Sequence, residues 1–215
     1  MKLYAYYRSS TSYRLRIALG LKGLAYDVIP VNLLNAEQRD PAFTARNPFG
    51  GVPLLDADGR ERAQSMAIIE WLDEAYHAGP LLPSSIEERF TVRELAYAIA
   101  TELHAPLNLP VLTYLKHEFG RSQDEVDIWY RHFLARTLTG VEARLAEHGA
   151  GDFLLDAPGL FECVAIPQLY NARRFAFDLA PYPHLARIEG ACLALPAFIA
   201  AHPDNQPDNP ENQRP

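Results

Sequence analysis

The segment "YYRSSTSYRLRIAL", residues 6–19, is the most informative stretch of the chain. A short apolar run ends in two tyrosines, four small hydroxyl residues follow at positions 9–12, and an amphipathic helical pattern then begins. Because a helix start carries free backbone N–H groups and the positive end of the helix dipole, hydroxyls there favour an anionic ligand. A plain helix cap by Ser12 explains the hydroxyls equally well. Three arginines add positive charge to the same place: Arg8, Arg14 and Arg16.

Outward from this stretch, residues 1–80 predict a small α/β unit. The expected order is a strand, a helix, a second strand, a partly helical loop, a hairpin and a helix, or βαβ-(α)-ββα. The hairpin turn is indicated by Asp58-Gly59 between two short extended segments. The predicted ranges are 1–7, 13–21, 25–33, 36–46, 50–56, 60–63 and 65–76.

The rest of the chain has a helical pattern. After a Pro-, Gly- and Ser-rich linker at 77–85, residues 86–205 predict an all-helical second domain. The fold class is therefore α/β plus all-α. Residues 206–215 are rich in Pro, Asn and Asp, and they predict a disordered tail or an extended strap on the surface. The predicted helices are 87–103, 122–148, 161–178, 183–195 and 196–202.

The composition argues against several classes of function. The 215 residues are 48% hydrophobic and 22% charged, and the formal net charge of -7 argues against nucleic acid as a partner. No apolar run is long enough for a membrane span, and the seven histidines form no metal-ligand motif, so we expect neither a membrane nor a metal site. The two cysteines, Cys163 and Cys192, lie far apart in the sequence, which favours a reducing cytoplasm.

Two further motifs in the first 80 residues could contact a ligand. In "NPFGGVP" (47–53), a cis Pro53 would aim the backbone of Val52 at a ligand, although a proline that merely starts an edge strand fits as well. Gln64 and Ser65 open the last helix of the unit, where they offer either another anion-binding helix start or a simple cap. Three such signals in this order are much stronger than each one alone.

Four segments resemble one known family. They are "RSSTSYRLRIALGLKG", "NPFGGVPLL", "QSMAIIEWLDE" and "PQLYNARRFAFDLAPYP", and all are similar to the zeta class of the cytosolic glutathione transferases. The resemblance covers about residues 1–200. It implies an N-terminal thioredoxin-like domain that binds glutathione, followed by a helical bundle on the substrate side. Because these transferases are generally dimers, it also implies a homodimer.

The resemblance assigns expected roles to single residues. Ser9 would face the glutathione sulfur, with Ser10 and Thr11 as further catalytic residues beside it. A hydroxyl donor at a helix start stabilises a thiolate and lowers the pKa of the thiol. For His104, a place in the helical core is an equally good interpretation. The residues implied in glutathione binding are Gln38, Val52, Pro53, Gln64, Ser65, His104 and Asn108.

The zeta class includes maleylacetoacetate isomerase and maleylpyruvate isomerase. The resemblance therefore implies a glutathione-dependent cis–trans isomerase that acts on a maleyl diketo acid during the breakdown of aromatic compounds. Such a dicarboxylate suits arginine, and Arg8 and Arg174 are the candidates, with Arg173 the weaker member of its pair. A structural salt bridge or a solvated face is the plain alternative for both neighbours. Other functions left open are a transferase or dehalogenase of small α-halo acids, and a glutathione-binding protein with little catalysis.

The sequence departs from the family pattern in two places. The family often has cysteine after two serines, whereas this chain has Thr11, so a disulfide oxidoreductase is disfavoured. A core helix that usually starts with a Ser or Thr cap and an Asp here has Gly159 and Glu162. We expect this helix to form with a weaker cap, because Glu162 can still reach back to the backbone. Cys163, next to it, is expected to be a buried helix residue and not a nucleophile.

Overall fold

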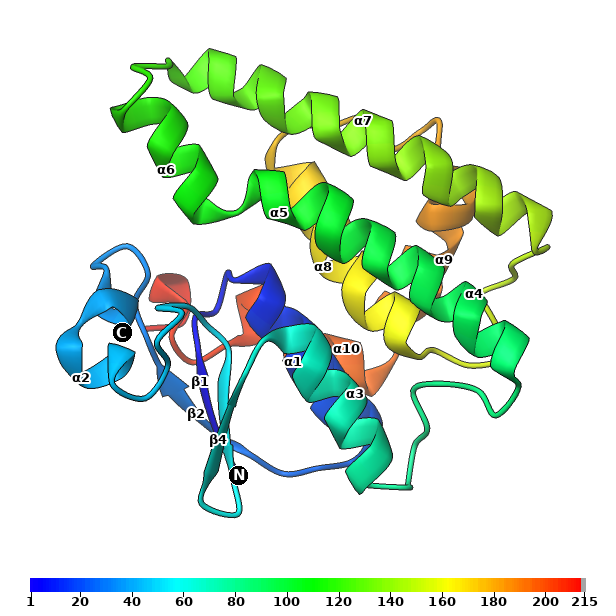
Figure 1. Cartoon of the computed structure of the whole chain (residues 1–215). Coiled ribbons are helices and arrows are strands. Elements are labelled where there is room, and N and C mark those ends of the chain that lie inside the picture. The colour runs from blue at the N-terminus through cyan, green and yellow to red at the C-terminus, as the bar shows by residue number, and fades with distance from the viewer. Residues whose placement is uncertain (214–215) are drawn as a thin grey trace. The chain divides into compact units, whose positions relative to one another are not determined.

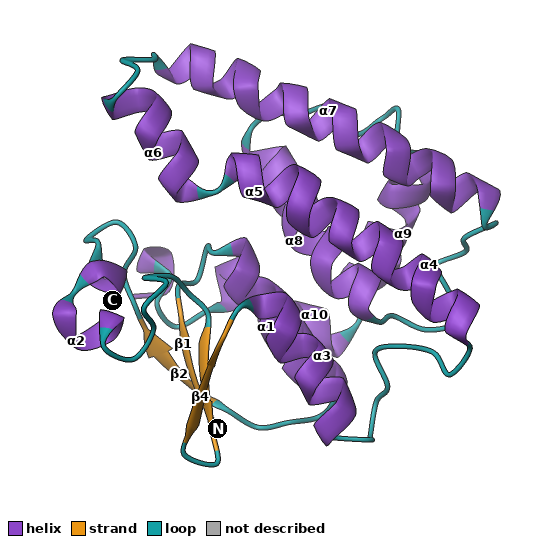
Figure 2. Ribbon diagram, viewed as in Figure 1, coloured by secondary structure: helices purple, strands orange, loops and turns teal. Residues whose placement is uncertain are grey.

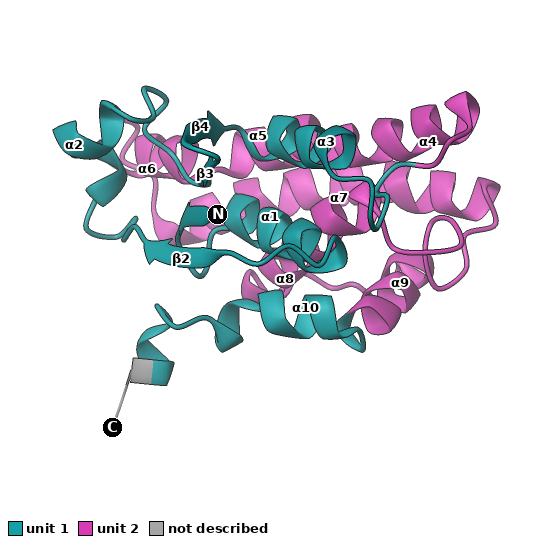
Figure 3. Ribbon diagram, turned by 90° about the horizontal axis from the view of Figure 1, so that it is seen from below, with its two compact units in different colours: residues 1–82, 193–215 teal, residues 83–192 magenta. Residues whose placement is uncertain are grey.

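A computed structural model describes residues 1–213 of the chain. They form two compact units (Figure 3). The first unit contains residues 1–82 together with the residues from Leu193 onward, and the second contains residues 83–192. Within the described residues, no helix is long and apolar enough to cross a membrane.

The first unit is built on a four-stranded sheet of order β2-β1-β3-β4. Strand β1 is parallel to β2 and antiparallel to β3, and β3 is antiparallel to β4. The parallel pair requires a crossover, which helix α1 (Ser10–Leu21) supplies. Asp58 and Gly59 both have positive φ angles, 56° and 72°, as a two-residue hairpin turn requires. The predicted order of elements is confirmed. The strands are β1 (Lys2–Ala5), β2 (Asp27–Pro30), β3 (Leu54–Ala57) and β4 (Arg60–Ala63).

Helices cover both faces of this sheet (Figures 1 and 2). Tyr4 of β1 packs edge-on against Phe43 of α2 (Pro41–Thr44), with the ring centroids 6.5 Å apart. Since side chains alternate along a strand, Leu3 points to the opposite face, where it is fully buried. That face is covered by α1 and by α3 (Ser65–Ala75). A 3-10 turn, η1 (Glu37–Arg39), precedes α2.

The C-terminal residues belong to the first unit, which corrects the predicted boundary of the helical domain at residue 205. A Cβ added to Gly20 of α1 would lie only 3.1 Å from the Cβ of Ala197 in α10 (Pro196–Ala201). The missing side chain at position 20 therefore lets α10 pack closely on α1. This close packing explains why residues 193–205 join the α/β unit and not the helical one.

The segment after α10 is ordered, so a disordered tail is the wrong prediction for residues 206–213. It contains two 3-10 turns, η3 (Pro203–Asn205) and η4 (Pro210–Gln213). Gln206 and Asn209 are buried, at 4% and 5% exposure, because their side-chain amides bond to backbone carbonyls. The alternative prediction of a strap on the surface describes this segment better.

The second unit is helical. Its interior contains large apolar side chains without exposure, among them Leu134, Leu145 and Phe161. Pro167 lies inside α8, in a helix that is buried along almost its whole length. The helices are α4 (Ile86–Tyr97), the π-helical η2 (Ala98–Leu103), α5 (His104–Leu107), α6 (Leu109–His117), α7 (Gln123–Glu147), α8 (Leu160–Arg174) and α9 (Pro183–Leu193).

Helix α6 was not among the predicted helices. The predicted helices leave residues 104–121 without one, because Pro106 and Pro110 disturb the apolar pattern there. In the structure Asn108 is extended, with φ −72° and ψ 159°, and its Oδ1 accepts the N–H of Val111 at 3.1 Å. Pro110 then occupies the first turn of α6, where its missing N–H costs no hydrogen bond. The asparagine cap followed by proline was the signal for this helix.

Candidate functional site

The hydroxyl run lies at the start of α1. Ser9 is extended, with φ −69° and ψ 120°, and its Oγ accepts the N–H of Ser12 at 3.2 Å. The helix cap is therefore Ser9. The plain interpretation, a cap by Ser12, is wrong. Ser10 is the first helical residue and is buried, and Ser12 is fully buried. Ser9 and Thr11 remain half-buried, so these two hydroxyls are the accessible part of the run.

The hydroxyls of Ser9 and Thr11 form a directed chain. Thr11 Oγ1 donates to the carbonyl oxygen of Val52 at 2.8 Å, and Ser9 Oγ lies 2.9 Å from Thr11 Oγ1. A hydroxyl has one hydrogen, so Thr11 must accept from Ser9. The hydrogen of Ser9 is thus directed at Thr11, and rotation about the Cβ–Oγ bond of Ser9 can redirect it to an incoming anion in exchange for that bond.

Val52 belongs to the loop between α2 and β3. Its bond to Pro53 is cis, as the sequence suggested. Asn47 supports this loop, since its Nδ2 donates to the carbonyl of Gly51 at 2.7 Å. Pro53 is buried, whereas Val52 is half-buried and keeps its backbone beside Thr11. The structure therefore brings together two segments, 9–11 and 52–53, that the sequence analysis had singled out separately.

The start of α3 forms a second polar group in the same unit. Gln64 has a positive φ of 72° and provides no side-chain cap, and Ser65 is the first helical residue and buried. Nη1 of Arg14 lies 3.5 Å from Ser65 Oγ. Arg14 is almost fully buried, at 1% exposure, and its Nε and Nη2 have no hydrogen-bond partner. Burial lowers the pKa of Arg14 to about 10, which leaves it charged at neutral pH.

Arg14 is a candidate site residue to which the sequence assigned no role of its own. It was counted only among the charges near the hydroxyl run. Its position in the second turn of α1 gave one signal, because arginine on an apolar helix face is rarely left without a partner. A buried cation beside an uncapped helix start favours an anion at that place.

Gln38 and Arg8 complete the candidates of the first unit. Gln38 lies in η1 and is buried, and its Oε1 has no hydrogen-bond partner. Arg8 is half-buried, and its guanidinium lies 5.6 Å from the ring centroid of Tyr7. Both residues can therefore still offer polar atoms to a ligand.

Three candidates lie in the second unit. His104 begins α5 and is half-buried, and Asn108 uses its side-chain oxygen to cap α6. Arg174 ends α8, and its Nη1 donates to Asn171 Oδ1 at 3.1 Å. Its neighbour Arg173 instead forms an ion pair with Glu189, with Nε and Oε1 3.2 Å apart. The plain alternative of a structural salt bridge is therefore found at Arg173.

The departures from the family pattern have clear structural outcomes. Gly159 is the N-cap of α8, and Glu162 Oε2 accepts its N–H at 2.8 Å, as expected. The second oxygen of Glu162 accepts the N–H of Leu154 at 2.8 Å. Burial raises the pKa of Glu162, and it also raises the pKa of the Cys192 thiol. Cys163 is fully buried, which fits a structural role.

The comparisons with known proteins agree with this geometry. Residues 1–74 match the glutathione S-transferase N-terminal domain. Maleylacetoacetate isomerase of Pseudomonas aeruginosa is 43% identical over 213 residues, which cover 98% of this chain and 99% of that protein. The chain belongs to the glutathione transferase family. The transferase fold accounts for both units: the sheet with α1 to α3 and α10, and the helices α4 to α9.

Solved structures place this glutathione transferase in the zeta class. The holo structure of a maleylpyruvate isomerase, described as a bacterial zeta-class enzyme, has a TM-score of 0.95 and 41% identity, covering 97% of this chain and 99% of that one. Maleylacetoacetate isomerase of Methylobacterium extorquens, solved with bound malonate and GSH, has a TM-score of 0.94 and 36% identity, covering 98% of this chain and 100% of that one. The resemblance to the zeta class is confirmed.

Proposed function

We propose that this chain is a glutathione-dependent cis–trans isomerase that converts a maleyl diketo acid, maleylacetoacetate or maleylpyruvate, to its fumaryl isomer in the breakdown of aromatic compounds. The observation that carries the proposal is the directed chain from Ser9 through Thr11 to Val52 at the start of α1. The hydroxyl hydrogen of Ser9 can be redirected from Thr11 to a thiolate, and it lies at a helix N-terminus, which favours an anion. The isomerase names of full-length relatives support the same reaction.

The residues of the first unit fit glutathione. An anionic group of the tripeptide, its γ-glutamyl carboxylate, suits the start of α3, where Gln64 and Ser65 offer polar groups. Buried Arg14 lies beside Ser65, and its Nε and Nη2 have no hydrogen-bond partner. The backbone of Val52, held before Pro53, suits the cysteinyl peptide. Gln38 suits the glycyl end. We assign His104 and Asn108 of the second unit to the same ligand.

Bound glutathione supplies a thiolate that can add to the cis double bond of the substrate and leave again, so that the bond can rotate. The chain's own residues have electrostatic tasks in that reaction. Ser9 donates its hydroxyl hydrogen toward the sulfur, and the N–H of Ser12 holds the Ser9 oxygen in place. The N–H groups at the start of α1 add positive potential, with buried Ser10 beside them. Together they favour the thiolate over the thiol.

The substrate side requires cations, because a maleyl diketo acid carries two carboxylates. We propose Arg8 and Arg174 for this task. Arg174 is exposed, and its Nη1 donates to the Asn171 amide. Arg173 is tied to Glu189 and is assigned to structure. The malonate in the Methylobacterium extorquens relative, also a dicarboxylate, supports a substrate of this class.

We also propose a homodimer in a reducing cytoplasm. Large apolar side chains are exposed on the first unit at Phe49, at 74%, and on α4 at Ile86 and Phe90, at 80% and 62%. Exposed apolar side chains of this size favour burial against another protein surface. Cys163 and Cys192 are free thiols, as a reducing compartment would keep them. Within this proposal, the first unit binds glutathione and the second serves the substrate.

An isomerisation assay tests the proposed function. Maleylacetone or maleylpyruvate is followed by ultraviolet absorbance with and without glutathione, and glutathione is titrated before and after. We expect turnover that requires glutathione and consumes none. Stoichiometric loss of glutathione on a small α-halo acid, with no isomerisation, would replace the isomerase by a transferase or dehalogenase. Turnover without glutathione would contradict both assignments.

A further inference from the structure

The backbone just after strand β1 has an N–H and a carbonyl, both of Tyr7, that form no hydrogen bond with another strand. Strand β2 stops at Pro30, whose partner in β1 is Ala5. Two residues later, the N–H of Tyr7 donates to Asp208 Oδ2 at 2.8 Å, and the carbonyl of Tyr7 accepts from Arg16 Nη2 at 2.8 Å. The N–H and the carbonyl of Tyr7, which belong to two successive peptide groups, are therefore both held by side chains, one of which comes from the C-terminal segment.

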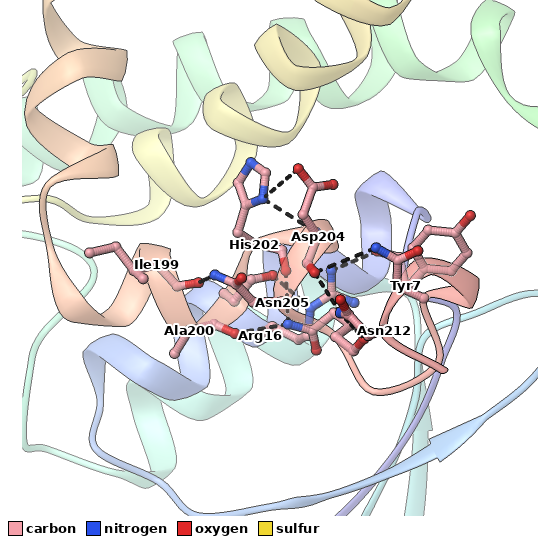
Figure 4. A network of polar contacts seen from close by, with 11 residues as sticks. Tyr7, Arg16, Ile199, Ala200, His202, Asp204, Asn205 and Asn212 are labelled. Carbon is pink, nitrogen blue, oxygen red and sulfur yellow. Dashed lines mark hydrogen bonds and ion pairs between the residues drawn. The ribbon is translucent and has the colours of Figure 1, made fainter. Parts of the chain in front are cut away.

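Arg16 connects the same peptide to the end of α10. It is buried, at 1% exposure, and its Nε donates to the carbonyl of Ala201 at 2.9 Å. Figure 4 shows Arg16 between Tyr7 and the residues that follow α10. Because a guanidinium is planar and rigid, one arginine fixes the spacing between the two backbone carbonyls that it contacts.

The C-terminal segment, residues 203–212, holds its own shape. Gln206 Nε2 donates to the carbonyls of Ala200 and His202, at 2.8 and 3.0 Å. Asn212 Nδ2 donates to the carbonyls of Asp204 and Gln206, at 2.6 and 3.0 Å. These bonds fold the segment into a compact strap, which presents Asp208 from a fixed backbone.

We propose that Asp208 is a positioning residue, through which the C-terminal strap fixes the turn that carries Arg8 and Ser9. Tyr7 precedes that pair directly, and the N–H of Ser9 donates to the carbonyl of Tyr6 at 3.0 Å. A shift of the backbone at Tyr7 therefore moves the Ser9 hydroxyl. The inference rests on the proposed function, because in it the strap orients the Ser9 hydroxyl, which stabilises the thiolate.

The carboxylate suits this task better than a neutral acceptor. A hydrogen bond from a backbone N–H to a carboxylate is shorter and stronger than one to an amide or hydroxyl. The other carboxylate oxygen, Asp208 Oδ1, is buried without a hydrogen-bond partner. Its desolvation costs free energy, which the fixed turn at Tyr7 offsets. A surface tail with no role in the site would not require a carboxylate with one oxygen buried and without a partner.

The test compares Asp208→Ala, Asp208→Asn and the matched control Asp178→Ala. Asp178 also accepts a backbone N–H, that of Ala180 at 2.9 Å, but in the second unit. The first readout is hydrogen exchange of the amides of Tyr7 to Ser9, without glutathione. The second is the thiol pKa of bound glutathione, from its thiolate absorbance against pH.

We expect Asp208→Ala to speed exchange at Tyr7 about tenfold, to raise the bound thiol pKa and to lower kcat about tenfold with little change in KM. Asp208→Asn should recover most of the loss, because its amide oxygen still accepts the Tyr7 N–H. Asp178→Ala should leave all three values unchanged. If Asp208→Ala does not fold, the smaller change Asp208→Ser serves with the same expectations.

Unchanged exchange at Tyr7 and an unchanged thiol pKa in Asp208→Ala would overturn the inference, even if the melting temperature fell. The proposed function fails separately: wild-type enzyme would then show no glutathione-dependent isomerisation. The exchange measurement still decides the role of the strap in that case, because it uses the protein without ligand.

Discussion

The starts of α3 and α7 are built in opposite ways. Helix α7 begins with a complete capping box, in which Ser122 accepts the N–H of Glu125 at 3.3 Å and Glu125 accepts the N–H of Ser122 at 2.9 Å. Helix α3 begins after Gln64, which caps nothing, and Arg14 lies buried beside it with spare donors. One helix end satisfies its own backbone, whereas the other has donors left for a ligand.

The starts of α1 and α8 repeat the contrast. Glu162 closes the start of α8 and is itself buried. Ser9 caps α1 with its oxygen, whereas its hydrogen, donated to Thr11, can be turned to a ligand. The N-termini of α7 and α8, whose backbone N–H groups bond to a glutamate of the same helix, are therefore structural. The N-termini of α1 and α3, which have donors available for a ligand, are assigned to glutathione. The predictions below break or sharpen this distinction.

Ser9→Ala should have the largest effect. Removal of one donor to a developing or bound anion in an active site costs about 10²–10³ in kcat, and glutathione binding should remain nearly intact. The variant also loses a helix cap, so Ser122→Ala is the matched control: it should cost about 1 kcal/mol in the free energy of unfolding and nothing in kcat. Steady-state kinetics and urea titrations measure both. Unchanged turnover in Ser9→Ala would remove Ser9 from the mechanism.

Arg14→Met should separate affinity from stability. The dissociation constant of glutathione, measured by calorimetry, should rise about 10- to 100-fold, since hydrogen bonds to charged groups contribute about 1.5–3 kcal/mol. The free energy of unfolding should stay equal or rise, because the variant removes a buried charge and keeps the volume. Cysteinylglycine, which lacks the γ-glutamyl carboxylate, should bind both proteins equally. A purely structural Arg14 would instead lower stability and leave the affinity of glutathione unchanged.

Arg174→Ala should raise KM for a dicarboxylate substrate about tenfold and for a neutral electrophile hardly at all, because it removes one charge-assisted contact. Arg173→Ala is the control on the same helix. It breaks the ion pair with Glu189 and should change stability without changing KM. Equal effects of Arg174→Ala on charged and neutral substrates would exclude Arg174 from the substrate site.

Glu162→Gln should change the pH dependence of stability. Burial raises the pKa of Glu162, so the folded state favours the protonated carboxyl. The stability that this shift contributes is complete below the unfolded-state pKa and is lost as the pH rises through the raised pKa. The unfolding free energy of wild type minus that of Glu162→Gln should therefore fall with rising pH, in urea titrations at several pH values. A difference that rises with pH would show that the two backbone hydrogen bonds outweigh burial.

The fold was largely predictable because its signals are local. The Asp58-Gly59 turn fixes the hairpin by its positive φ angles, and helical periodicity identified α7 and α8. The short helix α6 was missed because its cap, Asn108, lies between two prolines that masked the pattern. The position of α10 was missed because it depends on a distant close approach, that of Gly20 and Ala197.

The site was predictable only in part. The segments 9–11 and 52–53 could be singled out as motifs, but not the hydroxyl chain that joins them. Arg14 resembled one of several surface charges in the sequence, and burial alone distinguishes it. The bond between Asp208 and Tyr7 spans nearly the whole chain, so no local pattern could indicate it.

Backbone amide NMR during a glutathione titration tests the central distinction most directly. The account predicts chemical-shift changes at the starts of α1 and α3, for Ser10 to Ser12 and Ser65 to Ala67, and at Val52. It predicts none at the closed starts, Gln123 to Glu125 of α7 and Leu160 to Glu162 of α8. Chemical-shift changes at the N-termini of α7 and α8, or none at those of α1 and α3, would contradict it.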